Sequence, residues 1–467
     1  MRRLLLAGLS ALVGLVAVWI VAGGALARSR ERAVISRWSA AGLPIDDFAA
    51  RYPPHGPSEA ALRIEKAASR LGIALAPASD RSRPREEDVR RLDDLDVSST
   101  VARRFEKDDH GPLPGPLAGF LAEHASVLEE VRAAALAGDV AWEQDVERLY
   151  AAPEPKSRGH RSLVALLVLA ALDRASAGDG PGALGFIDAG HRINDAMRAR
   201  PDLLSLALAT TAERMLLGAL RRIPAPPIEW IDRLAADDRQ SLLVALEREG
   251  WMLTSVGTMG DASSLSVLRD GERDAVATTL LRLRAPLERP YLRLAGASSS
   301  DLVRQVAEGI ARAQLCDFDA VRLHALVPAD LPAWNVLGDV AVPGIGRLVP
   351  LVGRAALDRE LTALALRVAA TRSASGAWPP PGLAVEPGAC PEMALDAGET
   401  RTCFRSAVCP SLVWVLRERP AATTIVSWGK TMPASSSGPG FVPPALLGTE
   451  GLPLELVLPS LIPSTAD

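Results

Sequence analysis

The chain begins with an apolar segment long enough to cross a membrane, and this feature limits its fold more than any other. Residues 4–27 are apolar except for Ser10, and Arg2 and Arg3 precede them. A helix of this length extends for about 36 Å, whereas the hydrocarbon core of a bilayer is about 30 Å thick. We therefore expect a transmembrane helix over residues 4–27, which makes the membrane a partner of the chain.

A cleaved signal peptide is the alternative interpretation. The stretch Ala25-Leu26-Ala27 fits the small-residue pattern of a cleavage site. The apolar segment is longer than the 7–15 residues usual in a signal peptide, and this length favours an uncleaved anchor.

The charges around the segment give conflicting evidence on orientation. Four arginines follow it closely: Arg28, Arg30, Arg32 and Arg37. By the positive-inside rule they favour a cytoplasmic domain, but long domains are translocated largely regardless of charge. We expect a single-pass protein of the bacterial inner membrane with its large domain outside the cytoplasm.

Composition favours a mainly α fold. Hydrophobic residues make up 48% of the 467 residues but aromatic residues only 4%, so Ala, Leu and Val must build the core. These residues suit closely packed helices. The net charge of −4 lacks the basic character of a nucleic-acid-binding protein, so no nucleic-acid partner is expected. The predicted fold is an N-terminal transmembrane helix, antiparallel helical hairpins and a small C-terminal α+β element.

Breaks in the helical periodicity of apolar residues divide the chain into four parts. Residues 1–28 form the anchor or signal peptide, and residues 29–113 form juxtamembrane helices and a charged connector. Residues 114–330 form a helical domain, and residues 343–467 hold a helix, a small antiparallel sheet and a Pro-rich tail.

The helical hairpins are clearest in the third part. Residues 162–177 are almost continuously apolar, which predicts a helix buried on most sides. A turn at Gly178-Asp179-Gly180-Pro181 leads to a helix through Ile187 and Met197, and another follows Pro201. Residues at matching offsets do not recur, so a tandem-repeat array is less favoured. In the second part, Ser58 is a candidate N-cap.

Prolines and serines suggest two separate helices further on. We expect one over 271–284, ended or kinked by Pro286 and Pro290. A second helix is predicted over 300–326, with Ser300 as its N-cap.

The C-terminal part combines a helix with short strands. Leu357, Leu361, Leu364 and Val368 form an apolar stripe at helical spacing. Three β-like runs follow at 402–408, 412–416 and 423–428. They predict a small antiparallel sheet packed on this helix, with Trp414 and Trp428 in its core.

All four cysteines lie in the last third of the chain: Cys316, Cys390, Cys403 and Cys409. An even count outside the cytoplasm favours two disulfides, with three possible connectivities. A pair between Cys403 and Cys409 needs a turn, because a single strand would separate them by about 20 Å. Unpaired buried thiols are an alternative, and a metal site is the least favoured because C-x-x-C spacing is missing.

No motif specifies a reaction, so catalytic residues stay unknown and neither a cofactor nor a metal is predicted. Gly429-Lys430-Thr431 lacks the preceding glycine of a phosphate-binding loop. The six histidines show no metal-binding spacing, and G-x-S-x-G is not present.

Two stretches carry a resemblance. Residues 38–68, with Gly42-Leu43-Pro44 and Tyr52-Pro53-Pro54, resemble the start of uncharacterised membrane-anchored proteins of environmental bacteria. Residues 357–428, with Trp378-Pro379, resemble the C-terminal end of those proteins and are similar to the helix-then-strands arrangement of pseudopilins. The resemblance implies no activity.

Three functions remain open. The first is an envelope scaffold or interaction protein with a protein partner, which predicts an exposed apolar patch. The second is an envelope hydrolase with a dispersed site, which predicts a pocket where His191 or His324 lies near a carboxylate. The third is a carrier of lipid or another apolar ligand, which predicts an apolar cavity among the helices of 160–330.

Overall fold

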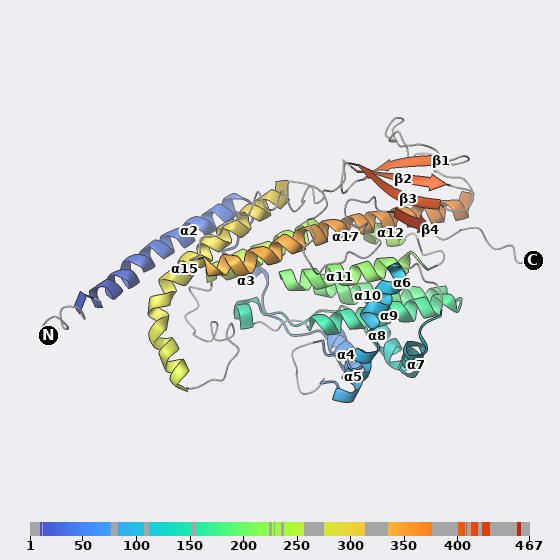
Figure 1. Cartoon of the computed structure of the whole chain (residues 1–467), viewed down its shortest axis with the longest axis horizontal. Helices are drawn as coiled ribbons and strands as arrows, with labels where there is room; N and C mark the ends of the chain where they lie inside the picture. The colour runs from blue at the N-terminus through green and yellow to red at the C-terminus, as the bar shows by residue number, and fades with distance from the viewer. Residues whose placement is uncertain are drawn as a thin grey trace, which may run out of the picture.

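The fold is mainly helical, with a small antiparallel sheet formed by C-terminal residues (Figure 1). It was derived from a computed structural model. The structure describes residues 10–11, 13–75, 83–106, 112–151, 156–223, 227, 229–234, 238–255, 275–312, 335–375, 400–406, 408, 412–418, 423–429 and 455–458. The fold class predicted from the sequence is confirmed.

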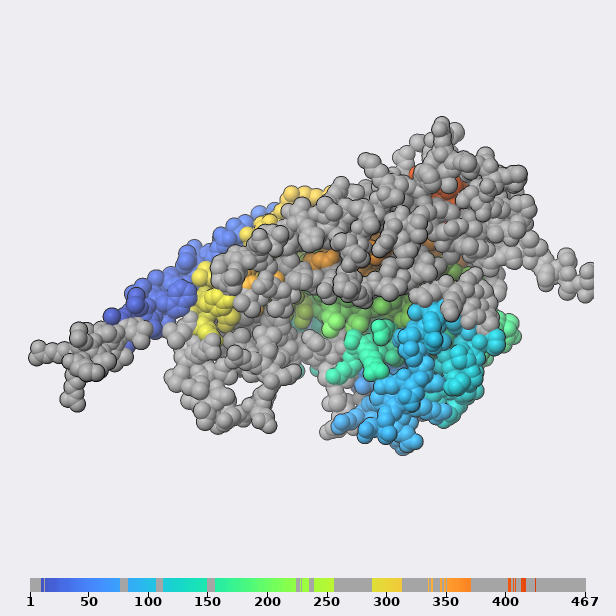
Figure 2. All heavy atoms as spheres, viewed as in Figure 1, coloured from blue at the N-terminus to red at the C-terminus, as the bar shows by residue number. Residues whose placement is uncertain are grey.

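The N-terminal helix, Val13–Ala40, is long and apolar enough to span a membrane. It contains a π-helical turn, η1 (Trp19–Gly23), and continues as α2 (Gly24–Ala40). Its large apolar side chains are exposed at Val13, Leu15, Val18, Trp19, Ile20, Val21 and Leu26. Figure 2 shows this helix extending from the body, with the later helix Ala275–Arg312 packed against part of its length. The large apolar side chains named above nevertheless stay exposed.

The first half of the chain forms short helices around one side of the body. They are α3 (Phe48–Arg51), α4 (Glu59–Ser69), α5 (Glu86–Asp94), α6 (Val97–Glu106), α7 (Gly115–Glu123), α8 (Ala125–Ala137) and the 3-10 helix η2 (Val146–Ala151). The hydroxyl of Ser58 accepts a hydrogen bond from the Ala61 amide at 3.2 Å, which confirms the predicted N-cap of α4.

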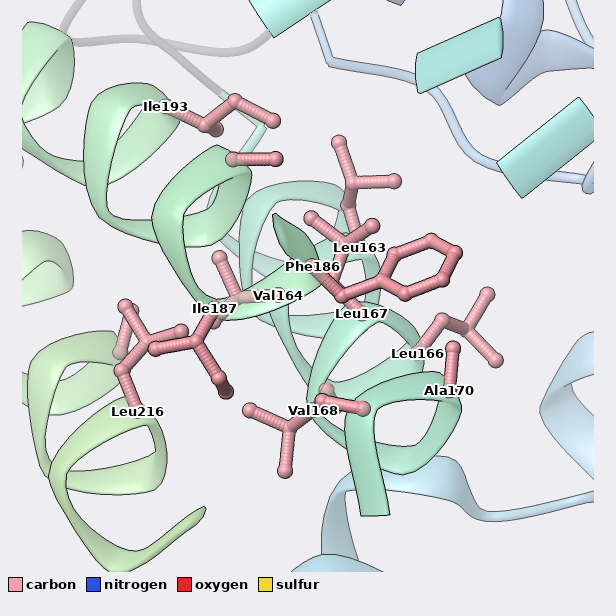
Figure 3. Close-up of a cluster of buried hydrophobic side chains, with 14 of the residues drawn as sticks. Leu163, Val164, Leu166, Leu167, Val168, Ala170, Phe186, Ile187, Ile193 and Leu216 are labelled. Carbon is pink, nitrogen blue, oxygen red and sulfur yellow. The ribbon is translucent and has the colours of Figure 1, made fainter. Parts of the chain in front are cut away.

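Three antiparallel helices form the centre of the first hydrophobic core. They are α9 (Ser157–Ser176), α10 (Gly180–Arg198) and α11 (Leu203–Leu220). Gly178 has φ +80° between α9 and α10, a conformation that glycine adopts without strain. Figure 3 shows side chains of all three helices meeting, among them Leu167, Ile187 and Leu216. The helix α11 is also apolar enough to span a membrane, but it is mostly buried and is therefore a core helix.

A second hydrophobic core joins the N-terminal helix to the body. It forms where α2 packs against α15 (Ala275–Arg312), which also packs against α13 (Asp238–Ser255). Trp38 on α2 is fully buried there. Each core contains residues from more than one of the four predicted parts of the chain. The division into four parts stays a prediction.

The expectation of two separate helices around residues 271–326 was wrong. A single helix, α15, runs through Pro286, Pro290 and Ser300, so Ser300 is not an N-cap. Ser300 instead accepts a hydrogen bond from Trp38, so a tertiary partner satisfies its hydroxyl. Figure 1 shows α15 bending in its first half, the half that holds both prolines, as expected when a ring removes a helical hydrogen bond. Residues 313–326 lie outside the described residues.

The sheet packs beside the longest helix, α17 (Val336–Ser375). Its strands are β1 (Thr400–Arg405), β2 (Leu412–Glu418), β3 (Thr423–Gly429) and β4 (Glu455–Leu458), in the order β1-β2-β3-β4. All neighbours are antiparallel. The first three strands were predicted, whereas β4 was not. Trp414 is buried, as predicted, and its Nε1 donates to Glu360 on α17 at 2.9 Å.

Candidate functional site

A pocket of about 380 Å³ lies where α10, α11 and α17 meet the helices α12 (Glu229–Leu234) and α13. Most of its lining side chains are polar or charged. The lining consists of His191, Asp195, Arg198, Ala199, Glu213, Arg233, Leu234, Ser241 and Arg359. Its walls therefore come from segments up to 168 residues apart in the chain.

Three arginines from three helices line this pocket. Arg198 lies at the end of α10, Arg233 on α12 and Arg359 on α17. Arg198 and Arg359 are largely buried, whereas Arg233 is half-buried and lies over the ring of Trp230 at 4.9 Å. Guanidinium groups bind carboxylate and phosphate groups through paired hydrogen bonds, so their convergence favours an anion.

Two carboxylates of the lining hold these arginines in place. Glu213 on α11 is buried and lies 2.8 Å from Arg198 and 3.8 Å from Arg359. Asp195 lies 3.2 Å from Arg233 and 3.6 Å from Arg198. The carboxylates thus bridge the arginines and fix their side chains before any ligand binds.

His191 lies in the same wall and is 3% exposed. Burial lowers the pKa of His191 well below its usual value, and Arg233, Arg198 and Arg359 lower it further. The imidazole is therefore neutral at pH 7. Within the described part of the chain its Nε2 has no hydrogen-bond partner, although its ring contacts that of Trp230 at 5.0 Å.

A second layer of charges lies behind the pocket, between α11 and α17. Arg221 donates to Asp358 at 2.7 Å and to the Thr362 hydroxyl at 2.6 Å, with both ionic side chains buried. Burial lowers the pKa of Arg214 and of Arg354.

Arginines and carboxylates alternate among the described residues of the pocket and of this second layer. The arginines are Arg198, Arg214, Arg221, Arg233, Arg354 and Arg359, and the carboxylates are Asp188, Asp195, Glu213 and Asp358. Buried charges are stable only when they are compensated, so these carboxylates stabilise the buried arginines around them.

The arrangement gives less support to metal or acid–base chemistry. Among the described residues, no group of three or more His, Cys, Asp or Glu side chains is placed to hold a metal ion. Ser241 and His191 both line the pocket, but burial and the three arginines oppose the protonation of His191 that base catalysis requires.

The structure describes only some of the candidate residues that were selected from the sequence. Cys403 on β1 is buried and disulfide-bonded, whereas Cys316, Cys390 and Cys409 lie outside the described residues. The connectivity therefore stays a prediction. His324 is also outside the described residues, whereas His191 lines the pocket.

Sequence reasoning missed the three arginines of the pocket. The chain has 48 arginines, since only four of its 52 cationic residues are lysines. Scattered arginines normally form a solvated surface, so nothing in their spacing distinguished these three. The apolar stripe of α17 gave no signal either, because Arg359 lies on the helix face opposite Leu357 and Leu361.

The fold and the pocket define a class of mainly helical protein that combines an N-terminal helix able to span a membrane with an arginine-lined site. Comparison with models of protein families, with curated proteins and with solved structures gave no match to this chain.

Proposed function

We propose that this chain is a membrane-anchored binding protein of the bacterial cell envelope, and that its helical domain binds a small anionic ligand outside the cytoplasm. The observation that carries the proposal is the convergence of Arg198, Arg233 and Arg359 on one pocket beside neutral His191. A phosphate or carboxylate ligand would accept hydrogen bonds from the guanidinium groups and from an Nε2–H of His191.

Two features support the anchor. The sequence Ala25-Leu26-Ala27 lies within a continuous helix, and Ala27 is fully buried. The apolar segment is therefore joined to the body by a continuous helix, which the Trp38–Ser300 hydrogen bond fixes in place. The exposed apolar side chains that precede it match a lipid environment.

The disulfide at Cys403 supports the location of the large domain. Disulfides persist in oxidising compartments and are rare in the bacterial cytoplasm. The positive-inside rule, applied to the four arginines after the anchor, favours a cytoplasmic domain instead. We give the disulfide more weight, because long domains are translocated largely regardless of charge.

The pocket and the exposed surface give less support to two of the functions predicted from the sequence, the carrier of an apolar ligand and the scaffold. A carrier of an apolar ligand would have an apolar lining, whereas five of the nine residues that line this pocket carry charged side chains. Outside the N-terminal helix, the large apolar side chains exposed on the described surface are Leu62 and Leu204, which do not make a patch. A protein partner in the envelope therefore remains a prediction for which the described surface offers no apolar patch, and an anion-binding protein is the best-supported function.

Calorimetric titration of the full chain in detergent tests this proposal. The probes are inorganic phosphate, citrate and, as a cationic control, spermidine. We expect saturable binding of an anion and none of spermidine. Arg233→Gln should weaken that binding by about tenfold or more, since a charge-assisted hydrogen bond contributes about 1.5–3 kcal/mol. Arg233 is half-buried, so its replacement is compatible with folding.

Arg192→Gln is the matched control. Arg192 is on α10 and, like Arg233 on α12, contacts Asp188, at 3.6 Å against 2.5 Å, but it does not line the pocket. Its replacement should leave anion affinity unchanged. Equal losses in both variants, or no anion binding by the unaltered chain, would contradict the proposal.

A further inference from the structure

The exposed surface of the N-terminal helix changes from apolar to basic within two residues. Leu26 is the last of its large exposed apolar side chains, and Arg28, Arg30 and Arg32 are all exposed. If the apolar part lies in the hydrocarbon core, these three arginines emerge at the level of the lipid headgroups.

A second helix brings more arginines to the same level. The buried Trp38–Ser300 hydrogen bond joins α2 to α15, and Glu31 interacts electrostatically with Arg293. In both pairs the partners are 262 residues apart, so α2 and α15 run parallel in one register. This register places exposed Arg289 level with Ala27, the last residue of the apolar segment.

We infer that Arg28, Arg30, Arg32, Arg289 and Arg293 form a basic collar that binds the phosphate groups of anionic phospholipids around the anchor. The inference rests on the proposed anchor but is independent of the anion pocket. It assigns to α15 a role that its sequence alone did not suggest, because α15 follows the anchor by about 250 residues.

The dimensions of the collar fit this ligand. Within each helix its first and last arginines are four positions apart, which corresponds to a rise of about 6 Å. The headgroup region of one leaflet is about 5–8 Å thick, since a bilayer of about 40–45 Å encloses a core of about 30 Å. All five guanidinium groups therefore fall within the layer that contains lipid phosphates, where arginine binds phosphate with two hydrogen bonds.

The charge of the surroundings is consistent with an anionic partner. Two carboxylates, Glu31 and Glu288, lie within the same band, so the five arginines leave a net positive charge. The next arginine on α2, Arg37, contacts Asp301 at 3.1 Å and is not part of the collar. On α2 the exposed arginines are thus those that directly follow the apolar segment.

Native mass spectrometry of the full chain, released from detergent after titration with defined lipids, tests the collar. The probes are phosphatidylglycerol, which is anionic, and phosphatidylcholine, which is zwitterionic. We expect tighter binding of phosphatidylglycerol, weakened by added salt. The triple variant Arg28→Gln, Arg30→Gln and Arg32→Gln should reduce that preference by about fivefold for each arginine replaced, and Arg289→Gln alone should reduce it about fivefold.

The matched control replaces three exposed arginines far from the anchor: Arg63, Arg70 and Arg91, each changed to Gln. This variant should keep the full preference for phosphatidylglycerol. Equal binding of both lipids by the unaltered chain would overturn the collar, as would an unchanged preference in the α2 triple variant.

Two further measurements distinguish a failure of the collar from a failure of the proposed anchor. If the chain does not partition into vesicles of either lipid, the anchor itself is wrong. If free glycerol phosphate competes with phosphatidylglycerol at equal concentration, the arginines bind a soluble phosphate and the membrane assignment is overturned. Thermal unfolding of each variant verifies that it folds, and Arg30→Gln alone replaces the triple variant if that variant unfolds.

Discussion

The indole Nε1 of Trp38 donates a hydrogen bond of 2.9 Å to the hydroxyl of Ser300, 262 residues further along the chain. Both side chains are fully buried. The bond links α2, the continuation of the apolar N-terminal helix, to the long helix α15. The helix that carries the apolar segment is therefore fixed to the body by a specific polar contact as well as by apolar packing.

Ser300→Ala should destabilise this junction. The substitution leaves the Trp38 N–H buried without its acceptor, which costs about 1–3 kcal/mol of unfolding free energy. Trp38→Phe removes the donor. In that variant the further substitution Ser300→Ala should lower the unfolding free energy much less than it does in the unaltered chain. Chemical denaturation of the two single variants and the double variant measures this coupling, and additive effects would show that the hydrogen bond does not stabilise the junction.

Gly296→Ala should separate α15 from α13. A Cβ at Gly296 would lie 2.1 Å from the Leu253 carbonyl oxygen, which belongs to the backbone and has little freedom to move. We expect a loss of about 1–3 kcal/mol from overpacking. Gly119→Ala in α7 is the matched control because nothing lies within 4 Å of its Cβ, and it should stabilise the protein by up to about 1 kcal/mol. Similar melting temperatures for the two variants would contradict the close packing of α13 and α15.

Asp358→Asn should strongly destabilise the contact between α11 and α17. It leaves the buried guanidinium of Arg221 without its countercharge, and such a loss typically costs about 3–5 kcal/mol. Glu123→Gln removes the partner of Arg91 at an exposed ion pair and should change the unfolding free energy far less. Denaturant titration of both variants compares them directly, and equal losses would show that Arg221 finds another countercharge.

Local patterns predicted the elements whose stability depends on nearby residues. The apolar run in α9, the turn at Gly178 and the N-cap at Ser58 were recognised because each acts within a few residues. The strands β1 to β3 were recognised from their short runs between turn residues. Patterns of this kind identify where an element forms, but not which distant segment it meets.

Distant partners explain the predictions that were wrong or missing. Serine often caps the first turn of a helix, which is why a helix start was predicted at Ser300. Trp38 instead donates a hydrogen bond to the Ser300 hydroxyl, and α15 continues through this residue. The strand β4 pairs with Thr423–Val426 of β3, and its own four residues are too few to show a strand pattern. The pocket arginines come from α10, α12 and α17, so only the tertiary fold brings them together.

His160 should make the protein less stable in mild acid. Its Nε2 lies 3.3 Å from Asn194 Oδ1, while Asn194 donates its amide to the Ala209 carbonyl, so the neutral ring donates from Nε2. Burial lowers the pKa of His160 from 6.5 to about 4, more than the Asn194 hydrogen bond raises it. Between these two values the unfolded chain binds a proton that the folded chain excludes, and stability therefore falls as the pH decreases from about 6.5 to about 4.

His160→Gln should remove this part of the pH dependence, because a glutamine amide can still donate to Asn194 but does not titrate. The full effect of His160 corresponds to on the order of 3 kcal/mol at acidic pH. Denaturant unfolding of both proteins at pH 8 and pH 5 tests this, and the variant should lose less stability between the two. Some acid sensitivity should remain, since the pKa of His191 is also lowered by burial. Identical losses in the two proteins would mean that His160 is protonated in the folded state, which its complete enclosure between α9 and α10 opposes.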